Sequence, residues 1–473
     1  MRLSRNARRR LALYGSALGV LAVVGLILVT APEGEHVHVR TFDVSASRQH
    51  EATRMLRDLV RFDTTNPPGG TRGITTYLGN AFACEGIPFE IVGDDPERPI
   101  IVARLEGMKR GDGLLLLNHL DVVPAGDLTK WRKPPFAAEF GDGVDSHYLI
   151  GRGTLDMKGQ AVASFFAMAA LRRAGIRPLR DIVFVGEPME ETYEPMRGIG
   201  WVLKNRPDLL EGVTDALNEA GVNEVVGDSI ARYGIEVMQK AVLIWKVKAK
   251  TREQLDALRV FLEARNAEQR WSLDPLAADF LRFLAPSRAD TIGKYLADPE
   301  AAFRSEFFRK TAPDVYIALL KDQVYATAIA EEPGGGFSTQ VVVTLLPGTP
   351  VLGMKAKGEA WFRDHGVTSE ITMQTPDCFS SPQSGRAWEV LNEVLAQDPV
   401  EKAPVGVYVL SGYFSHSSYV RAQGIRTYGV SPFNINFNDA QTVHREGERI
   451  HVGLFLEGVA RYERIVKEYA TRP

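Results

Sequence analysis

The sequence predicts an α/β protein: a main domain built on a mixed sheet flanked by helices, a second α/β domain inserted into it, and an N-terminal membrane segment. Short apolar runs alternate with stretches of helical periodicity along most of the 473 residues. Histidines and acids follow several of these apolar runs directly. A long uncharged run stands near the N-terminus. At 45% hydrophobic and 24% charged residues, the chain can bury more than one core.

The N-terminal segment has the composition of a membrane anchor. Residues 11–31 carry no formal charge, and roughly 20 apolar residues cross a bilayer, whereas the apolar region of a cleaved signal is about 7 to 15 residues long. We therefore expect residues 1–31 to be an uncleaved anchor. Arginines on its N-terminal side place the rest outside the cytoplasm, on the periplasmic or extracellular side. The alternative is a long signal cleaved after Ala31, which would release a secreted protein. The preceding arginines are Arg2, Arg5, Arg8, Arg9 and Arg10.

The remaining chain divides into three stretches. We expect residues 45–234 and 374–473 to form two parts of one catalytic domain, and residues 235–373 to be an inserted α/β domain. Strand-like runs at 100–105, 113–118 and 181–185 alternate with helical stretches such as 161–174, which is typical of a sheet with helices on its faces. The insertion has strand-like runs at 241–249 and 341–346 and a charged helical stretch at 252–284. It holds none of the clustered acids and histidines.

Composition excludes several functions. The net charge of −3 and the pI near 6.4 give no basic excess for binding phosphate backbones, so we expect no nucleic-acid partner. With only Cys84 and Cys378, the chain can build neither a disulfide framework nor a cysteine-rich zinc site. Any metal must be held by histidines and carboxylates.

The first candidate site residues end an apolar run. His119 and Asp121 follow four leucines, and strand alternation places both side chains on one face. Imidazole is a good zinc ligand, and a carboxylate behind it can fix its tautomer. The alternative is a structural histidine satisfied by other hydrogen bonds.

Three further segments extend the pattern. Asp156 lies in the glycine-rich run 151–159 just before a helix, where it is either a ligand or a helix cap. Glu190 and Glu191 follow an apolar run. Because adjacent side chains point in different directions, one of these carboxylates can hold a metal while the other acts as a general base. The alternative is a solvated acidic turn. His444 precedes a helix near the C-terminus and is otherwise a surface histidine.

Taken in this order, the motifs resemble the aminoacylase and carboxypeptidase family of co-catalytic zinc exopeptidases, which includes glutamate carboxypeptidase and the carboxypeptidase S branch. The runs 63–69 (DTTNPPG) and 131–136 (WRKPPF) share in the resemblance. It implies two divalent metals, zinc with cobalt or manganese as alternatives, and an insertion that acts as a lid and forms a homodimer. It also implies roles for six residues: His119, Asp156 (bridging), Glu191 and His444 as ligands, Asp121 to orient His119, and Glu190 as general base.

The sequence also departs from this family's pattern. Asn218 stands where the family has an acidic fifth ligand, and we expect its amide oxygen to coordinate a metal there without adding negative charge. Glu219 is the alternative ligand, but strand alternation would aim its side chain at the opposite face. The lid histidine and two arginines that grip a substrate carboxylate are missing, so we expect His416 and Arg421 to contact substrate instead. We expect a hydrolase that cleaves a peptide or N-acyl amino acid at the amide bond next to a carboxylate. The alternative is a membrane-tethered pseudoenzyme that uses the fold for binding.

Overall fold

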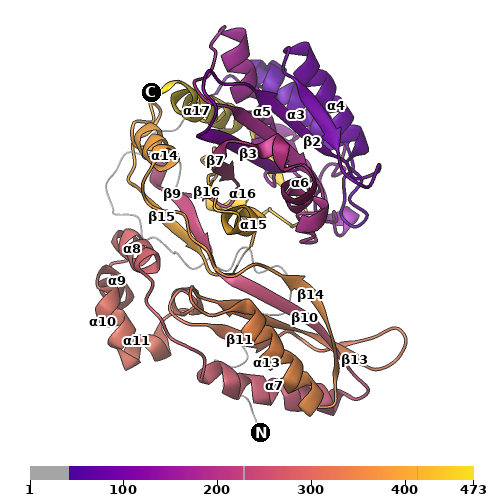
Figure 1. The fold of residues 1–473 in the computed structure, drawn as a ribbon, viewed down its shortest axis with the longest axis vertical. Coiled ribbons are helices and arrows are strands. Elements are labelled where there is room, and N and C mark those ends of the chain that lie inside the picture. The colour runs from indigo at the N-terminus through magenta and orange to yellow at the C-terminus, as the bar shows by residue number, and fades with distance from the viewer. Residues whose placement is uncertain (1–41, 227–228, 413) are drawn as a thin grey trace. The chain divides into compact units, whose positions relative to one another are not determined.

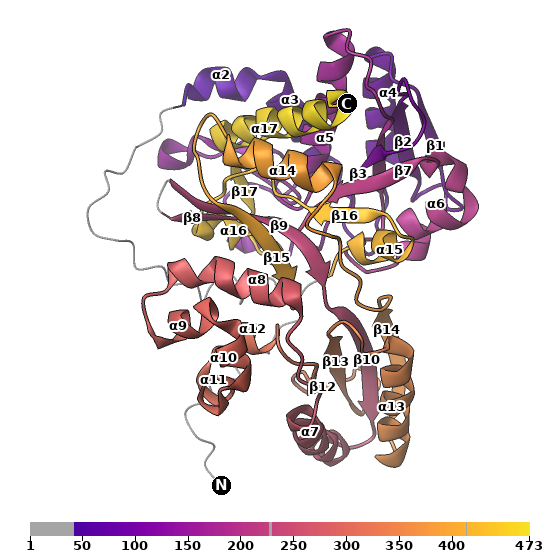
Figure 2. The same cartoon turned by 60° about the vertical axis from the view of Figure 1, so that its left-hand side comes forward.

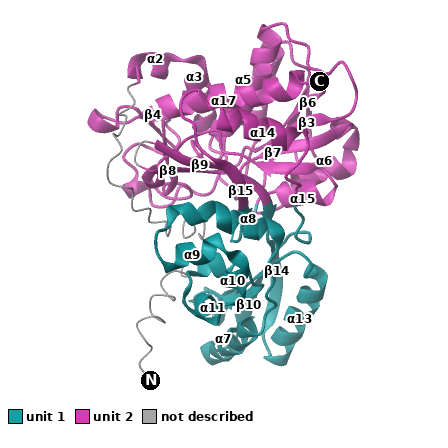
Figure 3. Ribbon diagram, turned by 90° about the vertical axis from the view of Figure 1, so that its left-hand side faces the viewer, with its two compact units in different colours: residues 1–30, 238–380, 409–414 teal, residues 31–237, 381–408, 415–473 magenta. Residues whose placement is uncertain are grey.

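The computed structural model describes residues 42–226, 229–412 and 414–473. Its described residues form two compact units, of which unit 1 comprises 238–380, 409–412 and 414, and unit 2 comprises 42–226, 229–237, 381–408 and 415–473 (Figure 3). The expected membrane segment, residues 1–31, lies outside the described residues. None of the described helices combines the length and the apolar character that crossing a bilayer requires.

Unit 2 is organised around a nine-stranded mixed sheet, which confirms the predicted α/β class (Figure 1). The strand order is β1-β2-β6-β3-β7-β16-β9-β15, with β8 paired to β9. β9 and β15 begin in unit 2 and end in unit 1. The strands are β1 (Phe89–Val92), β2 (Ile100–Leu105), β3 (Gly113–His119), β6 (Ile182–Glu187), β7 (Val213–Asn218), β8 (Val222–Val226), β9 (Ser229–Gln239), β15 (Val405–Leu410) and β16 (Arg426–Gly429).

The four central strands β6, β3, β7 and β16 run parallel. β3 is buried at every position, as parallel strands covered on both faces are, and this explains its run of leucines. In register, His119 lies opposite Glu187, and Asn218 opposite Gly429. Because the carboxyl ends of parallel strands meet at one edge of a sheet, the segments that follow these strands converge there.

Helices cover both faces of this sheet. On one face, Ile199 and Val202 of α6 and Val420 of α15 pack on strand residues such as Leu115. On the other face, Phe82 of α4 contacts Phe165 of α5 and Phe184 of β6, with ring centroids 5.0 and 5.1 Å apart. Helix α17 packs on α5 and α14 (Figure 2). The helices of unit 2 are α2 (Val44–Gln49), α3 (Glu51–Arg61), α4 (Arg72–Cys84), α5 (Lys158–Arg173), α6 (Ile199–Asn205), α14 (Arg386–Ala396), α15 (Ser417–Ala422), α16 (Phe437–Ala440) and α17 (Val452–Thr471).

A small second sheet in unit 2 joins distant parts of the sequence. Its order is β17-β5-β4, from β4 (Glu139–Phe140), β5 (Tyr148–Ile150) and β17 (Arg449–His451). The antiparallel pairing of β17 with β5 places Arg449 opposite Ile150. The segment just before β17 is thereby held against the glycine-rich segment that follows β5.

Unit 1 has its own sheet and core. The strand order is β11-β13-β10-β14, with β12 paired to β13. Trp245 and Leu243 of β10 pack with Leu258 of α7 and Phe362 of α13 in one apolar cluster. The elements are β10 (Ala241–Ala249), β11 (Gln323–Ala326), β12 (Ala330–Glu331), β13 (Phe337–Leu345), β14 (Thr368–Gln374), α7 (Arg252–Ala267), α8 (Pro275–Leu284), α9 (Thr291–Ala297), α10 (Pro299–Arg304), α11 (Glu306–Thr311), α12 (Asp314–Ile317) and α13 (Val351–Asp364).

Candidate metal centre

The candidate site lies in unit 2, at the edge where the parallel strands end. His119 is the last residue of β3, Glu190 and Glu191 follow β6, and Glu219 follows β7. Asp156 comes from the turn before α5, and His444 from the loop between α16 and β17. The structure brings the predicted residues His119, Asp156, Glu191 and His444 together. We call these four residues and Glu219 the metal-centre cluster.

His119 is buried, and each of its two ring nitrogens has a distinct neighbour. Nδ1 lies 2.9 Å from the main-chain oxygen of Asp121. Because a carbonyl can only accept, Nδ1 carries a proton, and Nε2 is the nitrogen available to a metal. Nε2 lies 2.9 Å from Asp156 Oδ1 and 3.7 Å from Glu219 Oε2.

His444 stands on the other side of Asp156. Its Nε2 lies 2.7 Å from Asp156 Oδ2 and 3.1 Å from Glu191 Oε2. Asp156 therefore presents one oxygen to each histidine, as a bridging carboxylate does. His444 has a positive φ of 59°, a backbone conformation that is uncommon for residues other than glycine and that clusters at functional sites.

Asp121 is fully buried behind these ligands and holds the backbone of the acidic pair. Its Oδ1 accepts the N–H of Glu190 at 3.3 Å, and its Oδ2 accepts the N–H of Glu191 at 3.1 Å. Asn66 donates to Oδ2 as well, at 2.7 Å. Burial raises the pKa of Asp121, but contacts with His119, Asn66 and Glu191 outweigh it and leave the pKa below its usual range. Asp121 thus fixes where Glu190 and Glu191 point.

Glu219, the residue after the predicted ligand Asn218, joins the cluster. The side-chain amide of Asn218 donates to Ser417 Oγ at 2.9 Å and to Ser415 Oγ at 3.4 Å, whereas Glu219 reaches His119. The alternation argument was wrong for Glu219 because β7 ends at Asn218. Beyond it the chain turns through Ala220, whose φ is +80°.

Burial and mutual charge set the protonation of the cluster. Burial lowers the pKa of His444, but Glu191 and Asp156 raise it to about 11. Burial and the neighbouring Asp156 raise the pKa of Glu191 to about 7. Burial also raises the pKa of Asp156, but His119 and His444 bring it well below its usual range. The positive charges of protonated His119 and His444 thus offset the negative charges of the carboxylates. Divalent cations can offset these negative charges instead.

Glu190 is buried beside this cluster. His119, Glu190 and Glu219 each place one nitrogen or oxygen atom within 4.8 Å of the corresponding atoms of the other two. The same is true of His119, Asp156 and Glu191. Burial, and then the charge of Glu219, raise the pKa of Glu190 well above its usual range. A carboxylate in this environment accepts a proton readily.

The donor set fits divalent metal ions. Two imidazoles and three carboxylates are ligands that suit zinc, cobalt and manganese. Glu191 Oε1 is buried without a hydrogen-bond partner among the described residues. Buried polar atoms are normally paired, so this oxygen marks a place where a ligand is expected.

His416 and Arg421, the predicted substrate contacts, both have partners within the protein. Arg421 is buried, and its two terminal nitrogens donate to the carboxylate of Glu236 at 2.8 and 2.7 Å. A substrate carboxylate would have to displace Glu236 from this fork. His416 is fully buried, with Nδ1 2.9 Å from Glu187 Oε1. Both side chains support the fold behind the strand ends.

Glu448 is a positioning residue that the sequence reasoning missed. Its buried Oε1 accepts the backbone N–H groups of Gly153, Leu155 and Asp156 at 3.1, 2.9 and 3.3 Å. Its Oε2 accepts from Arg152 Nη1 at 2.6 Å. Glu448 therefore holds the turn that presents Asp156. Nothing in the sequence links Glu448 to this turn, because the link is made through the pairing of β17 with β5.

Removing the charge of Glu448 should destabilise unit 2. Glu448→Gln leaves the buried guanidinium of Arg152 without its counter-ion, and breaking a buried pair costs about 3–5 kcal/mol of unfolding free energy. Urea unfolding of the metal-free protein measures the loss. Glu446→Gln, the same change at a partly exposed neighbour, should stay within about 0.5 kcal/mol of the parent. Equal midpoints for the two variants would contradict the role of Glu448.

Comparisons with known proteins identify a matching family and several relatives. The family described as peptidase family M20/M25/M40 matches residues 115–468. A deformylase of N-formyl-4-amino-5-aminomethyl-2-methylpyrimidine from Halalkalibacterium halodurans is 31% identical over 149 residues, which is 31% of this chain and 34% of that protein. The matched stretch thus spans about a third of that relative.

Solved structures resemble the whole fold at low sequence identity. An M20 family metallo-carboxypeptidase from Sulfolobus solfataricus superimposes with a TM-score of 0.67 at 15% identity, covering 89% of this chain and 100% of that one. Human carnosine dipeptidase 1 gives a TM-score of 0.66 at 16% identity, covering 90% and 98%. At these identities the likeness shows the fold alone.

Proposed function

We propose, from the premise that the chain belongs to peptidase family M20/M25/M40, that it is a metal-dependent hydrolase acting on a peptide or N-acyl amide bond next to a carboxylate. The observation that carries this proposal is the metal-centre cluster with the buried carboxylate of Glu190 beside it. Within the family, the order of the motifs in this chain resembles that of the aminoacylase and carboxypeptidase members.

The cluster divides into two ligand groups that share Asp156. His119 and Glu219 form one group with Asp156 Oδ1, and His444 and Glu191 form the other with Oδ2. Two imidazoles favour zinc, with cobalt or manganese as alternatives. Three carboxylates from Asp156, Glu191 and Glu219 would offset most of the charge of two divalent ions.

The residues around the cluster supply the rest of the chemistry. When bound, a pair of divalent ions polarises the scissile carbonyl and lowers the pKa of water. Glu190, whose raised pKa suits proton transfer, accepts the proton of the attacking water and delivers it to the leaving nitrogen. Asp121 acts through Glu190, because it holds the backbone N–H of that residue.

The main argument for the alternative, a pseudoenzyme, no longer holds. It rested on an uncharged fifth ligand at Asn218 and on the missing lid histidine. Because Glu219 stands beside His119, the cluster keeps three carboxylates, and its charge suffices for two divalent ions. Arg421 donates to Glu236, so its guanidinium is already engaged within the protein.

Metal analysis and a substrate screen test the proposal together. We expect two metal equivalents per chain and turnover of dipeptides or N-acyl amino acids that is lost on chelation and restored by zinc, cobalt or manganese. Metal content is measured by elemental analysis of the purified protein, and turnover by amine release. Less than one equivalent of metal, with no turnover on either substrate class under any of these metals, would contradict it.

A further inference from the structure

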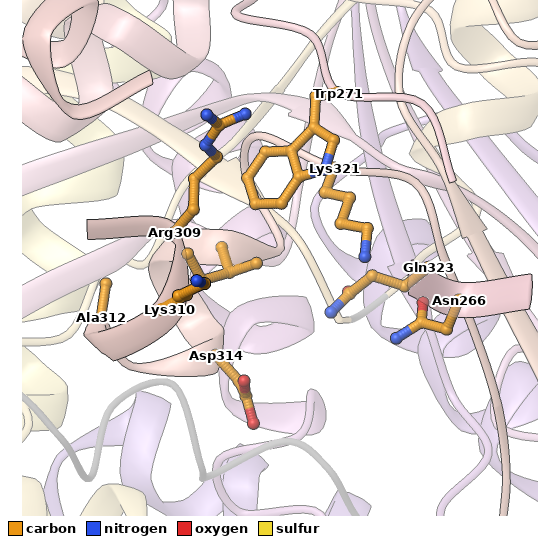
Figure 4. A pocket seen from close by; sticks show the side chains of 9 residues that line it. Asn266, Trp271, Arg309, Lys310, Ala312, Asp314, Lys321 and Gln323 are labelled. Atoms are coloured by element: carbon orange, nitrogen blue, oxygen red, sulfur yellow. The ribbon is translucent and has the colours of Figure 1, made fainter. Parts of the chain in front are cut away.

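A polar pocket lies wholly within unit 1, and none of the metal-centre residues lines it. Segments from the end of α7 to the start of β11 enclose a cavity of about 300 Å³ (Figure 4). Its lining includes Trp271, Arg309 and Lys321. Trp271 and Lys321 form an isolated antiparallel bridge, so the backbone holds these two residues in register.

Two cations flank the indole of Trp271. The Arg309 guanidinium carbon and Lys321 Nζ each lie 5.4 Å from the ring centroid, and the two side chains approach the ring from opposite sides in Figure 4. Lys321 is only 7% exposed. Within the described ranges, neither its ammonium nor the Arg309 guanidinium has a carboxylate partner, and Lys321 Nζ has no hydrogen-bond acceptor. Burying an unpaired ammonium is costly, and burial lowers the pKa of Lys321.

Two amide side chains add hydrogen-bond donors. Asn266 Oδ1 accepts the N–H of Val324 at 3.0 Å, and Gln323 Oε1 accepts from Thr344 Oγ1 at 3.4 Å. Because both oxygens are engaged, the amino groups are the ends left to face the cavity, as Figure 4 shows. The pocket therefore offers donors from both cations and both amides.

The charge balance of the lining favours an anion. Lys310 also lines the cavity, but its ammonium pairs with Glu306 on the same helix. Asp314 is the one carboxylate of the lining, against the cations Arg309 and Lys321. Trp271 carries both cations against its ring, so it positions charge and offers little free face for stacking a ligand.

We propose that this pocket binds the oxyanion group of a small ligand, a phosphate or a carboxylate, between Lys321, Arg309 and the amides of Asn266 and Gln323. Arg309 can donate two parallel hydrogen bonds to either group, and Lys321 supplies a point charge. A cavity of about 300 Å³ leaves room for a few further atoms beyond the anion. The site is independent of the proposed hydrolysis, because unit 1 holds every residue that forms it.

Calorimetric titration of the full chain tests the site, with inorganic phosphate in one arm and succinate in the other. Both are run in about 0.15 M chloride, which screens exposed charges. We expect the protein to bind one equivalent of phosphate or of succinate saturably. The anion that binds with the higher affinity shows whether the pocket prefers a phosphate or a carboxylate. Lys321→Met and Arg309→Gln should each weaken binding by about tenfold or more, because each removes a charge-assisted hydrogen bond.

Lys294→Met is the matched control, since it makes the same substitution at an exposed lysine of α9 outside the pocket. It should bind as the parent does. Lys321→Met removes an unpaired buried charge, so we expect this variant to fold. Arg309→Gln tests the pocket at a second residue, which is exposed. Absence of saturable binding to either anion in the parent would overturn the proposal, as would equal binding by the parent and both pocket variants.

Discussion

Glu190→Gln should lower kcat by about 100- to 10,000-fold, the range that a general acid–base group contributes. The glutamine keeps the size of the side chain but cannot accept the proton of the attacking water. The backbone N–H of residue 190 would still donate to Asp121, so the ligands around it should keep their positions. We therefore expect two metal equivalents in the variant, measured alongside its steady-state kinetics.

The metal content decides between two roles for Glu190, because its carboxylate lies close enough to His119 and Glu219 to be a ligand itself. Loss of a metal equivalent in Glu190→Gln would contradict the assignment as a base. Glu194→Gln makes the same change at an exposed position four residues further along and should leave both kcat and metal content unchanged. A variant of Glu190 with full activity would remove it from the reaction.

Glu219→Gln should weaken one of the two metal sites strongly while leaving the other filled. The change removes one of three carboxylate charges and a ligand facing His119 Nε2. Outer-shell partners alone are worth about 10- to 100-fold in metal affinity, so a ligand should cost at least that much. Competition with a chelator, followed by metal analysis, gives the affinity of each site.

Asn218→Ala is the matched control for this experiment. It removes the adjacent amide, which bonds to Ser417 and Ser415 and not to the cluster. We expect it to keep two metal equivalents, with a modest loss of stability from the lost hydrogen bonds. The reverse result, with metal lost in Asn218→Ala and retained in Glu219→Gln, would restore Asn218 as the ligand.

Much of the central fold could be predicted from periodicity and strand composition. The predicted run 100–105 is β2, and the run 113–118 is β3 without its last residue. The leucine run of β3 predicts a strand because a parallel strand that is buried on both faces has apolar residues at successive positions. The helical stretch 252–284 divides into α7 and α8, because Asp274 caps a new helix that begins at Pro275.

The site was predictable where a residue follows a strand directly and less so where long-range contacts decide. His119 ends its strand, so its direction follows from the strand itself. Glu219 lies one residue beyond its strand, where alternation no longer applies. The partners of Arg421 and Glu448 come from distant segments, Glu236 and Arg152, and no local pattern signals such pairs.

The pairing of β17 with β5 also sets the order in which the site can form. A ribosome makes β5 and the turn of Asp156 long before it reaches His444, Glu448 and β17. Until then the turn lacks the carboxylate that accepts three of its N–H groups, and Asp156 lacks one of its two imidazoles. The nascent chain therefore cannot assemble the complete metal-centre cluster until synthesis has passed His444, Glu448 and β17.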